Sequence, residues 1–402
     1  MIPRRTVFCL GLSQLVCWGI SYYLIGVFGA LMAADLGWSL TAVYGGFTAA
    51  LVVMGLSSPV IGRMIDRYGG RRVMVTGSVL TAVGCAAMAV SHTVFVYYAA
   101  WLCVGLAMRM TLYEAAFAAL ARIGGPDSRL AISQITLLGG LASTTLWPIG
   151  QALAAHFGWR TAVFVYAVFA LLTIPLHLAI PDTRYGDLQQ GRPTVKRVPL
   201  AESPRDRVIA GSLYALIATL ANFLNAGMSA HMIAMLAGFG LAASVSVWIS
   251  TLRGIGQTSA RFCEVLFGKR MHPLTLNLVA ALVLPFCFAV GLLSGQFVVA
   301  AIAFAFFYGA GNGIVTITRG TLPLVLFDPR TYGAFTGRLL VPSFIISAFA
   351  PIVYAYVIQR LGEAGALYLS IALALVILAA AVALRAMFRP GRAADEKAEE
   401  TI

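Results

Sequence analysis

Four ionisable residues lie within long apolar runs of the sequence: Arg109, Glu114, Arg253 and Arg319. At bilayer depth a charged side chain costs at least about 2.5–3.5 kcal/mol on insertion scales, so such residues are functional candidates by default. A guanidinium group can grip a carboxylate through two parallel hydrogen bonds. Three arginines against one glutamate therefore favour binding of a small organic anion.

Glu114 is the first candidate for a proton-coupling residue, and His231 is the second. Burial favours the neutral carboxyl and a nearby arginine favours the carboxylate, so solute binding could change the protonation of Glu114. Arg109 and Glu114 are five residues apart, which places them about 140° apart on a continuous helix and disfavours a direct pair. The alternatives are that these two nevertheless form a structural pair, that Arg319 belongs to a cytoplasmic gate, and that His231 is simply hydrogen-bonded.

Uncharged polar and aromatic residues accompany these charges. Asn222 and Asn225 could offer polar contacts to a solute, and the alternative is that they join neighbouring helices by hydrogen bonds. Ring side chains that could line a cavity, or simply pack, include Trp18, Tyr22, Tyr23 and the candidate solute ligand Tyr113. Neither a GxSxG nor an HExxH motif occurs, so we expect no catalytic residues, no metal site and no cofactor.

The elements that must position these residues are apolar helices. The 402 residues are 60% hydrophobic and 11% charged, whereas soluble domains carry about 25% charged residues. A bilayer-spanning helix needs about 20 apolar residues. We predict an all-α membrane protein with twelve transmembrane helices at 6–33, 40–61, 73–91, 94–121, 130–155, 161–180, 208–236, 241–267, 272–293, 297–326, 333–360 and 364–388.

The distribution of positive charge predicts the orientation of these helices. With a cytoplasmic N-terminus, 22 of the 28 Lys and Arg residues fall in cytoplasmic segments, and only Arg160 and Arg360 fall in outside loops. This asymmetry follows the positive-inside rule and places both termini in the cytoplasm. It also accounts for the net charge of +13 through attraction to anionic lipid heads, so we expect no nucleic-acid partner.

The sequence predicts two related halves. We expect an N-terminal six-helix bundle (1–180), a cytoplasmic central loop (181–207), a C-terminal six-helix bundle (208–388) and a cytoplasmic tail (389–402). The segment 62–72 recurs 198 residues later at 260–270, so that Arg63 matches Arg261 and Asp66 matches Glu264. A duplicated six-helix unit is a known transporter architecture. The six cysteines lie in apolar segments and are expected to be buried thiols.

One motif resembles a family signature. The residues Gly62, Asp66, Arg67, Gly69, Arg71 and Arg72 resemble the loop signature G-x-x-x-D-[RK]-x-G-R-[RK] of the major facilitator superfamily, with Gly70 displacing the basic pair by one position. The resemblance implies alternating access, with this cluster acting as a conformational latch that is closed in the outward-facing state. Arg261 and Glu264 would form its counterpart. The alternative is that these charges only anchor the topology.

The resemblance and the intramembrane charges together predict a secondary active transporter. We expect it to move a small organic anion such as a carboxylate with proton coupling, as a symporter or antiporter, and to be a monomer in a bacterial inner membrane. The position of Arg253 is loosely similar to that of an arginine in monocarboxylate and oxalate transporters. The alternatives are a multidrug or metabolite exporter of the same fold and a membrane-embedded enzyme.

Overall fold

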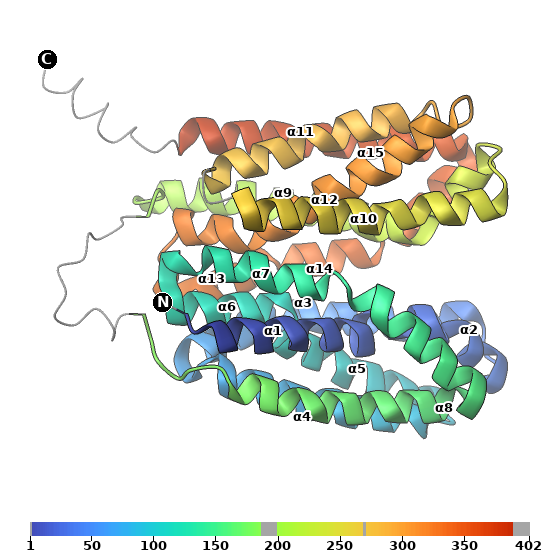
Figure 1. The fold of residues 1–402 in the computed structure, drawn as a ribbon, viewed down its shortest axis with the longest axis horizontal. Helices are drawn as coiled ribbons and strands as arrows, with labels where there is room; N and C mark the ends of the chain where they lie inside the picture. The colour runs from blue at the N-terminus through green and yellow to red at the C-terminus, as the bar shows by residue number, and fades with distance from the viewer. Residues whose placement is uncertain (1, 186–198, 268–270, 389–402) are drawn as a thin grey trace, which may run out of the picture. The chain divides into compact units, whose positions relative to one another are not determined.

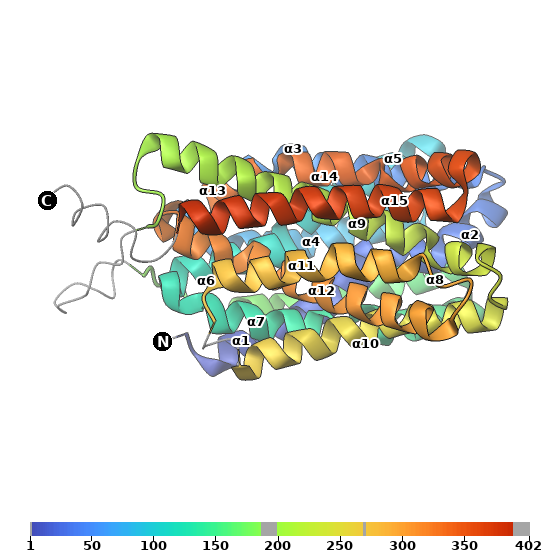
Figure 2. The ribbon, with the colours of Figure 1, turned by 90° about the horizontal axis from the view of Figure 1, so that it is seen from above.

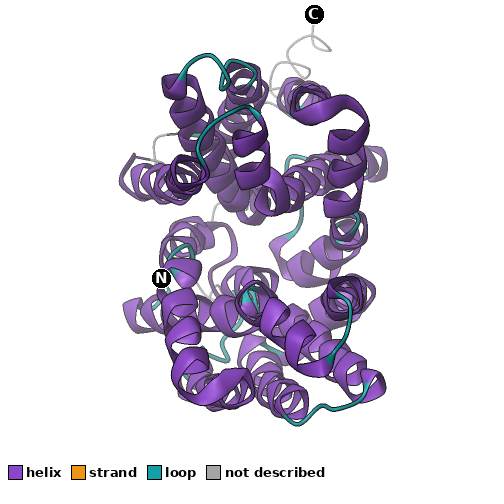
Figure 3. Ribbon diagram, turned by 90° about the vertical axis from the view of Figure 1, so that its right-hand side faces the viewer, coloured by secondary structure: helices purple, strands orange, loops and turns teal. Residues whose placement is uncertain are grey.

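The structure is a computed structural model that describes residues 2–185, 199–267 and 271–388 (Figure 1). Throughout these ranges the regular secondary structure is helical (Figure 3). Contacts divide the chain into two compact units, which are described separately. Unit 1 is Met1–Gly191 with Arg330–Ala348, and unit 2 is Arg192–Pro329 with Phe349–Ile402. The sequence-based boundary between six-helix halves is a different division and stays a prediction.

Unit 1 contains the first helices of the chain together with two short helices from much later in the sequence. The short helices α13 and α14 pack along α3. The described elements of the unit are α1 (Arg4–Cys17), the π-helical turn η1 (Trp18–Tyr22), α2 (Leu24–Leu36), α3 (Leu40–Tyr68), α4 (Gly70–Ala89), α5 (Val94–Thr111), α6 (Tyr113–Gly124), η2 (Gly125–Ser128), α7 (Arg129–Gly139), α8 (Ala142–Leu178), α13 (Tyr332–Leu339) and α14 (Val341–Ala348).

Unit 2 is built from five long helices in the part of the chain that is described. They are α9 (Pro204–Gly238), α10 (Ala243–Phe267), α11 (Pro273–Gly291), α12 (Val298–Leu326) and α15 (Ala350–Met387). The helix α15 packs against both α9 and α11, and Figure 2 shows it running beside them. The 3-10 turn η5 (Pro329–Thr331) follows α12 in sequence.

The helix ends follow from local chemistry. The side chains of Ser39, Thr93 and Ser203 each accept a hydrogen bond from a backbone N–H in the first turn of the helix that follows. Such caps satisfy donors that have no partner within the helix. Gly158 and Gly362 have φ of 80° and 71° within α8 and α15, and each produces a kink that separates two helical segments. Only glycine adopts this conformation at little cost.

The two units repeat one packing pattern. In unit 1, α5 packs against α3 and α4, and α8 packs against α4 and α1. In unit 2, α12 packs against α10 and α11, and α15 packs against α11 and α9. The kinks at Gly158 and Gly362 stand about 200 residues apart, as do the left-handed turns at Gly37 and Gly240. The internal repeat seen in the motif thus extends to helix packing and turn geometry.

Four predicted helices are interrupted, and one of them, 333–360, is divided into α13, α14 and the first part of α15 at Leu340 and Phe349. The predicted helix 6–33 contains the π-helical turn η1, and helix 94–121 breaks at Leu112, whose backbone is extended. Helix 130–155 is interrupted around Gly140 and Leu141, between α7 and α8. These continuous predictions were wrong because apolar periodicity does not report where tertiary contacts replace a helical hydrogen bond.

Eight helical stretches of the described chain are long and apolar enough to cross a membrane, and one of them, Val94–Leu178, covers three of the predicted helices. The number of crossings and the cytoplasmic ends stay predictions. All six cysteines are free, but only Cys17, Cys85 and Cys287 are buried. Cys9 and Cys103 are partly exposed and Cys263 is exposed, so the expectation of six buried thiols was wrong for these three. Most of the central loop (186–198), the repeat residues 268–270 and the tail (389–402) lie outside the described residues.

Candidate functional site

The polar residues of unit 2 gather around Asn225. Its side-chain oxygen accepts a hydrogen bond from the Arg253 guanidinium and another from Asn312 Nδ2, at 3.0 Å. The Arg253 guanidinium also lies over the Tyr308 ring, 5.3 Å from its centroid. Three helices, α9, α10 and α12, therefore contribute to one cluster, here called the Asn225 cluster. The contacts of Arg253 in the described part of the chain are all with neutral groups, so its positive charge is not neutralised there.

A second arginine of unit 2 is held in the same way. Arg319 Nη1 donates to Asn222 Oδ1 at 2.9 Å, and the Tyr214 hydroxyl donates to the Arg319 backbone carbonyl at 2.8 Å. Asn222 and Asn225 are three residues apart and thus share one face of α9. The structure therefore brings together four of the candidate solute ligands, each arginine paired with one asparagine.

Sequence reasoning missed Asn312 and Tyr308. A signal for Asn312 was available, because Asn312, Thr316 and Arg319 recur at spacings of four and three residues and so share one face of α12. A polar stripe on an otherwise apolar helix indicates contact with polar partners or water. Tyr308 carried no such signal, because a tyrosine in an apolar run is usually a packing residue.

Arg109 lies in unit 1, with only 1% of its surface exposed. Its Nε donates to Ser58 Oγ at 2.8 Å and its Nη2 donates to the Ser58 carbonyl at 3.3 Å, while Nη1 has no hydrogen-bond partner in the described part of the chain. Glu114 lies close enough to interact electrostatically with Arg109. The 140° estimate does not apply, because the chain is extended at Leu112 between them.

Glu114 occupies the first turn of α6 and is 6% exposed. The N-terminal end of a helix carries partial positive charge and favours a carboxylate. Tyr113, the preceding residue, donates its hydroxyl to the Thr136 carbonyl at 3.3 Å, and its ring lies 4.9 Å from that of Trp18 and 5.5 Å from that of Phe117. Tyr113 and Glu114 are thus the first two residues of the helix that begins after the break at Leu112.

His231 is hydrogen-bonded through a backbone carbonyl. Its Nε2 lies 2.8 Å from the Pro351 carbonyl oxygen, which can only accept, so Nε2 carries the proton. Its ring stacks on Tyr354 with centroids 6.4 Å apart. This contact agrees with the alternative that His231 is a hydrogen-bonded structural residue.

Asp66 meets the N-terminal end of a helix far away in the sequence. Its carboxylate oxygens accept the backbone N–H of Gly333 at 2.9 Å and of Ala334 at 2.7 Å, in the first turn of α13. At Gly62 an added Cβ would collide with the Gly333 carbonyl, so the two backbones touch. Arg122 Nε donates to the Asp66 carbonyl at 3.2 Å. The partner of the Asp66 carboxylate is thus the N-terminal end of a neighbouring helix.

The other motif residues take separate partners. Arg67 lies over the Tyr68 ring at 5.2 Å, and Arg71 Nε donates to the Ile180 carbonyl at 2.6 Å. Gly69 has φ of 88° at the turn between α3 and α4, and Arg72 is exposed in the first turn of α4. In unit 2, the counterparts Arg261 and Glu264 are 2% and 7% exposed on α10. Arg71 thus holds neighbouring backbone near the turn, while Asp66 and Gly62 contact α13.

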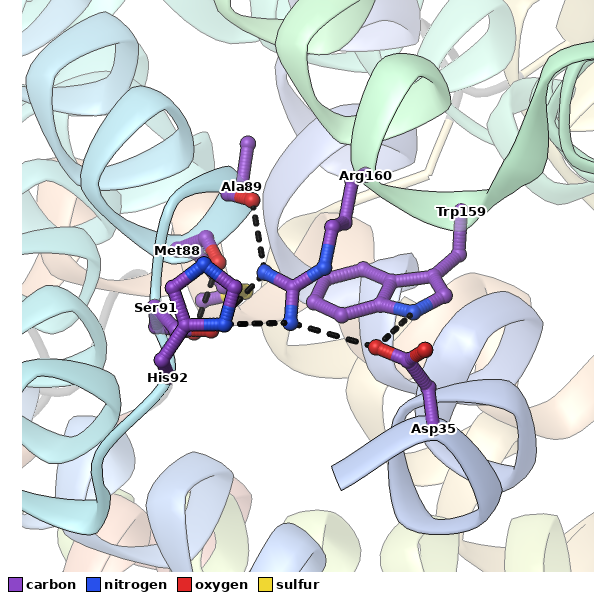
Figure 4. A network of polar contacts seen from close by, with 7 residues as sticks. All are labelled: Asp35, Met88, Ala89, Ser91, His92, Trp159 and Arg160. Atoms are coloured by element: carbon purple, nitrogen blue, oxygen red, sulfur yellow. Dashed lines mark hydrogen bonds and ion pairs between the residues drawn. The ribbon is translucent and has the colours of Figure 1, made fainter.

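A second polar network in unit 1 surrounds Arg160 (Figure 4). Arg160 donates to the carbonyls of Ala89 and Ser91 at 2.9 and 2.8 Å and pairs with the Asp35 carboxylate at 3.1 Å. Asp35 also accepts from Trp159 Nε1 at 3.2 Å. The network ties the ends of α2 and α4 to the segment of α8 that follows the Gly158 kink.

We expect Arg160→Gln to lower the free energy of unfolding by about 1–2 kcal/mol, because two carbonyls lose a charged donor. Asp35→Asn should cost about 0–1 kcal/mol, because the ion pair is partly exposed and asparagine keeps an acceptor for Trp159. Thermal unfolding of the purified protein in detergent measures both. Equal losses would show that the ion pair, rather than the carbonyl contacts, carries the stability.

A family model for the major facilitator superfamily matches residues 10–339 of the chain. The chain belongs to the major facilitator superfamily. Its fold agrees, since the human organic anion transporter MFSD10 (TETRAN) superimposes with a TM-score of 0.70 at 17% identity, covering 94% of this chain and 99% of that one. The proton:xylose symporter XylE, bound to 6-bromo-6-deoxy-D-glucose, superimposes with a TM-score of 0.75 at 13% identity, covering 96% and 95%.

The chain is also similar in sequence to the uncharacterized 38 kDa protein in the 23S RNA operon of Thermoproteus tenax. It is 24% identical over 395 residues, which cover 97% of this chain and 98% of the relative. Membership identifies the chain as a multi-pass membrane transporter of small-molecule solutes and not an enzyme. The resemblance inferred from the Gly62–Arg72 motif is thereby confirmed.

Proposed function

We propose that this superfamily member transports a small organic anion, such as a carboxylate, by alternating access with proton coupling. The observation that carries the proposal is the charge of Arg253, held in place by Asn225 and Tyr308 and not neutralised by a carboxylate in the described residues. A guanidinium at bilayer depth is costly unless a partner compensates it. A carboxylate solute is such a partner, because it accepts two parallel hydrogen bonds from one guanidinium.

The neutral partners of Arg253 support this assignment physically. A permanent Asp or Glu partner would compete with an anionic solute for the guanidinium. Asn225 instead fixes its orientation through one N–H group without cancelling its charge, which leaves further donors for a ligand. Arg319 with Asn222 repeats the same pairing. One of the proteins with a similar fold, human MFSD10, is an organic anion transporter, which agrees with this choice of substrate class.

A second candidate is an exporter of drugs or metabolites with the same fold. The side chains favouring it are the aromatic rings of unit 1 around Trp18 and Tyr113, which suit apolar compounds of varied shape. The positive charge of the Asn225 cluster disfavours cationic drugs.

A thermal-shift screen of the purified protein at two pH values separates the two functions. We expect carboxylates to raise the unfolding temperature in a manner that saturates with concentration, because a ligand that binds only the folded state stabilises it. Phosphates and cationic drugs are the comparison sets. Stabilisation by unrelated cations, with none by carboxylates, would refute the anion proposal and favour the exporter.

We propose Glu114 as the proton-coupling residue, since it is buried and lies close enough to Arg109 for electrostatic interaction. Glu114→Gln mimics the neutral carboxyl permanently, so solute-driven proton movement into proteoliposomes should fall to background while solute exchange continues. His231→Gln is the comparison variant and should keep proton movement near the unmodified level. The reverse pattern would assign coupling to His231 and exclude Glu114.

We further propose that the contact of Asp66 with α13 is the conformational latch of the transport cycle. Carboxylate acceptors at a helix N-terminus are favourable and reversible, and the contact joins segments more than 260 residues apart. Arg261 and Glu264 are the proposed counterpart in unit 2. We also propose that the protein works as a monomer in a bacterial inner membrane, with both ends in the cytoplasm.

A further inference from the structure

Three interruptions of helical structure in unit 1 meet at one place. They are the π-helical turn η1, the extended residue Leu112 and the junction of α7 with α8 around Gly140. The Trp18 ring in η1 lies 4.9 Å from the Tyr113 ring, and an added Cβ at Gly139 would collide with Tyr113. Interrupted helices inside a membrane persist where they are buried in protein or border a solute cavity, and π-helical turns are frequent at functional sites.

The π-helical turn changes which side chains are neighbours. The Tyr23 N–H bonds back to the Trp18 carbonyl, five residues earlier, so Tyr22 and Tyr23 both lie beside Trp18. Ring centroids are 5.0 Å apart for Trp18 and Tyr22 and 6.0 Å apart for Trp18 and Tyr23. Phe47 on α3 extends the group, 5.2 Å from Tyr22. We call these residues, with Tyr113, the aromatic cluster.

The aromatic cluster is only partly covered, unlike the core of the unit. Trp18, Tyr22, Tyr23 and Phe47 are half-buried, whereas Tyr97 and Trp101, which lie next to Phe47 in space, are fully buried. These half-buried rings, from η1, from Tyr23 that follows it and from α3, expose part of their surface, on which a further flat group could pack. Aromatic groups associate in offset or edge-to-face arrangements at centroid distances of 4.5–7 Å.

One acceptor and one donor next to this cluster have no hydrogen-bond partner in the described part of the chain. The Gln14 amide donates through Nε2 to the Thr111 carbonyl at 2.8 Å, a carbonyl freed by the break at Leu112. That bond fixes the amide orientation and leaves Gln14 Oε1 without a donor, on a side chain with no exposed surface. Trp18 Nε1 is a buried donor without an acceptor.

The two groups are neighbours on one helix face. The Trp18 backbone N–H donates to the Gln14 carbonyl, so the two residues are one helical turn apart and their side chains lie on the same side. A buried polar atom without a partner is costly, and few occur in a folded protein. A hydroxyl group satisfies both at once, because it donates one hydrogen bond and accepts others.

We propose that unit 1 carries a binding subsite for a hydroxylated aromatic ring of the transported solute. The ring packs on the aromatic cluster, and its hydroxyl donates to Gln14 Oε1 and accepts from Trp18 Nε1. This inference rests on the proposed function in one respect: the ring that occupies the subsite is assumed to belong to the transported solute. It narrows the substrate class to anions that carry a phenol-like ring.

The test compares dissociation constants of 4-hydroxybenzoate, benzoate and cyclohexanecarboxylate for the full-length purified protein. We expect 4-hydroxybenzoate to bind about two- to tenfold more tightly than benzoate, and benzoate to exceed cyclohexanecarboxylate by a similar factor. Trp18→Phe keeps a ring but loses the N–H, so it should reduce the hydroxyl advantage, because only the hydrogen bond to Gln14 Oε1 remains, and it should retain the ring preference. The matched control Trp248→Phe, at an exposed position on α10, should change neither.

The same measurements distinguish a missing ring subsite from a missing anion site. If the three acids bind equally and all are lost in Arg253→Gln, the ring subsite is refuted and the anion function stands. If none of the acids binds, the neutral probe 4-hydroxybenzyl alcohol is compared with cyclohexanemethanol. Tighter binding of the former that is reduced but not abolished in Trp18→Phe supports the subsite without the anion, and equal binding of the two probes overturns the subsite.

Discussion

Replacement of Arg253 by glutamine should reduce solute uptake at least tenfold while the protein remains folded in the membrane. Arg253 supplies the positive charge of the Asn225 cluster, and a hydrogen bond to a charged group contributes about 1.5–3 kcal/mol, which corresponds to about 10- to 150-fold in binding. Glutamine keeps donor capacity but loses the charge and the planar fork. Uptake into proteoliposomes and ligand-induced thermal stabilisation are the two measurements.

Arg360→Gln is a matched control for this experiment. Arg360 also lies over a tyrosine ring in unit 2, 5.7 Å from the centroid of Tyr356, but it is exposed. It should leave uptake unchanged. Arg253→Lys separates charge from geometry, because lysine keeps the charge without bidentate bonding, and an intermediate loss is expected. Normal uptake in Arg253→Gln would remove this residue from the site.

The second large effect is expected at the Asp66 contact with α13. Asp66→Asn replaces one of two acceptor oxygens by an NH2 group that cannot accept the N–H of Gly333 or Ala334, and it removes the charge that the helix end favours. We expect transport to fall at least tenfold, because the state that this contact stabilises loses population. Gly62→Val should have a similar effect by preventing the approach of the two backbones.

Substrate binding in detergent distinguishes this loss from a defect in the binding site. Asp66→Asn should keep the dissociation constant of the solute within about threefold while transport collapses, since a latch changes populations more than contacts to solute. Asp127→Asn changes an exposed aspartate of the same unit and is the control. Full transport by both Asp66→Asn and Gly62→Val would reduce the motif to a topology anchor.

The sequence by itself determined the class of the protein. Sixty per cent hydrophobic residues cannot be buried in a soluble protein of this size with so few charges to cover it, so a helical membrane protein follows from composition. The Gly62–Arg72 motif and its repeat at 260–270 could be recognised because each is a short run of consecutive residues. The candidates Arg109, Arg253 and Arg319 could be named because charge is rare and costly in apolar helices.

Only the tertiary structure decided which partners these residues have. Asn225 takes both Arg253 and Asn312, and Asp66 takes the end of α13, because those segments pack side by side although they are far apart in the chain. The break at Leu112 and the π-helical turn at Trp18 were also invisible in the sequence. A helix gives up its own hydrogen bonds only where a group from another element, such as the Gln14 amide, replaces them, and that replacement is a property of the folded chain.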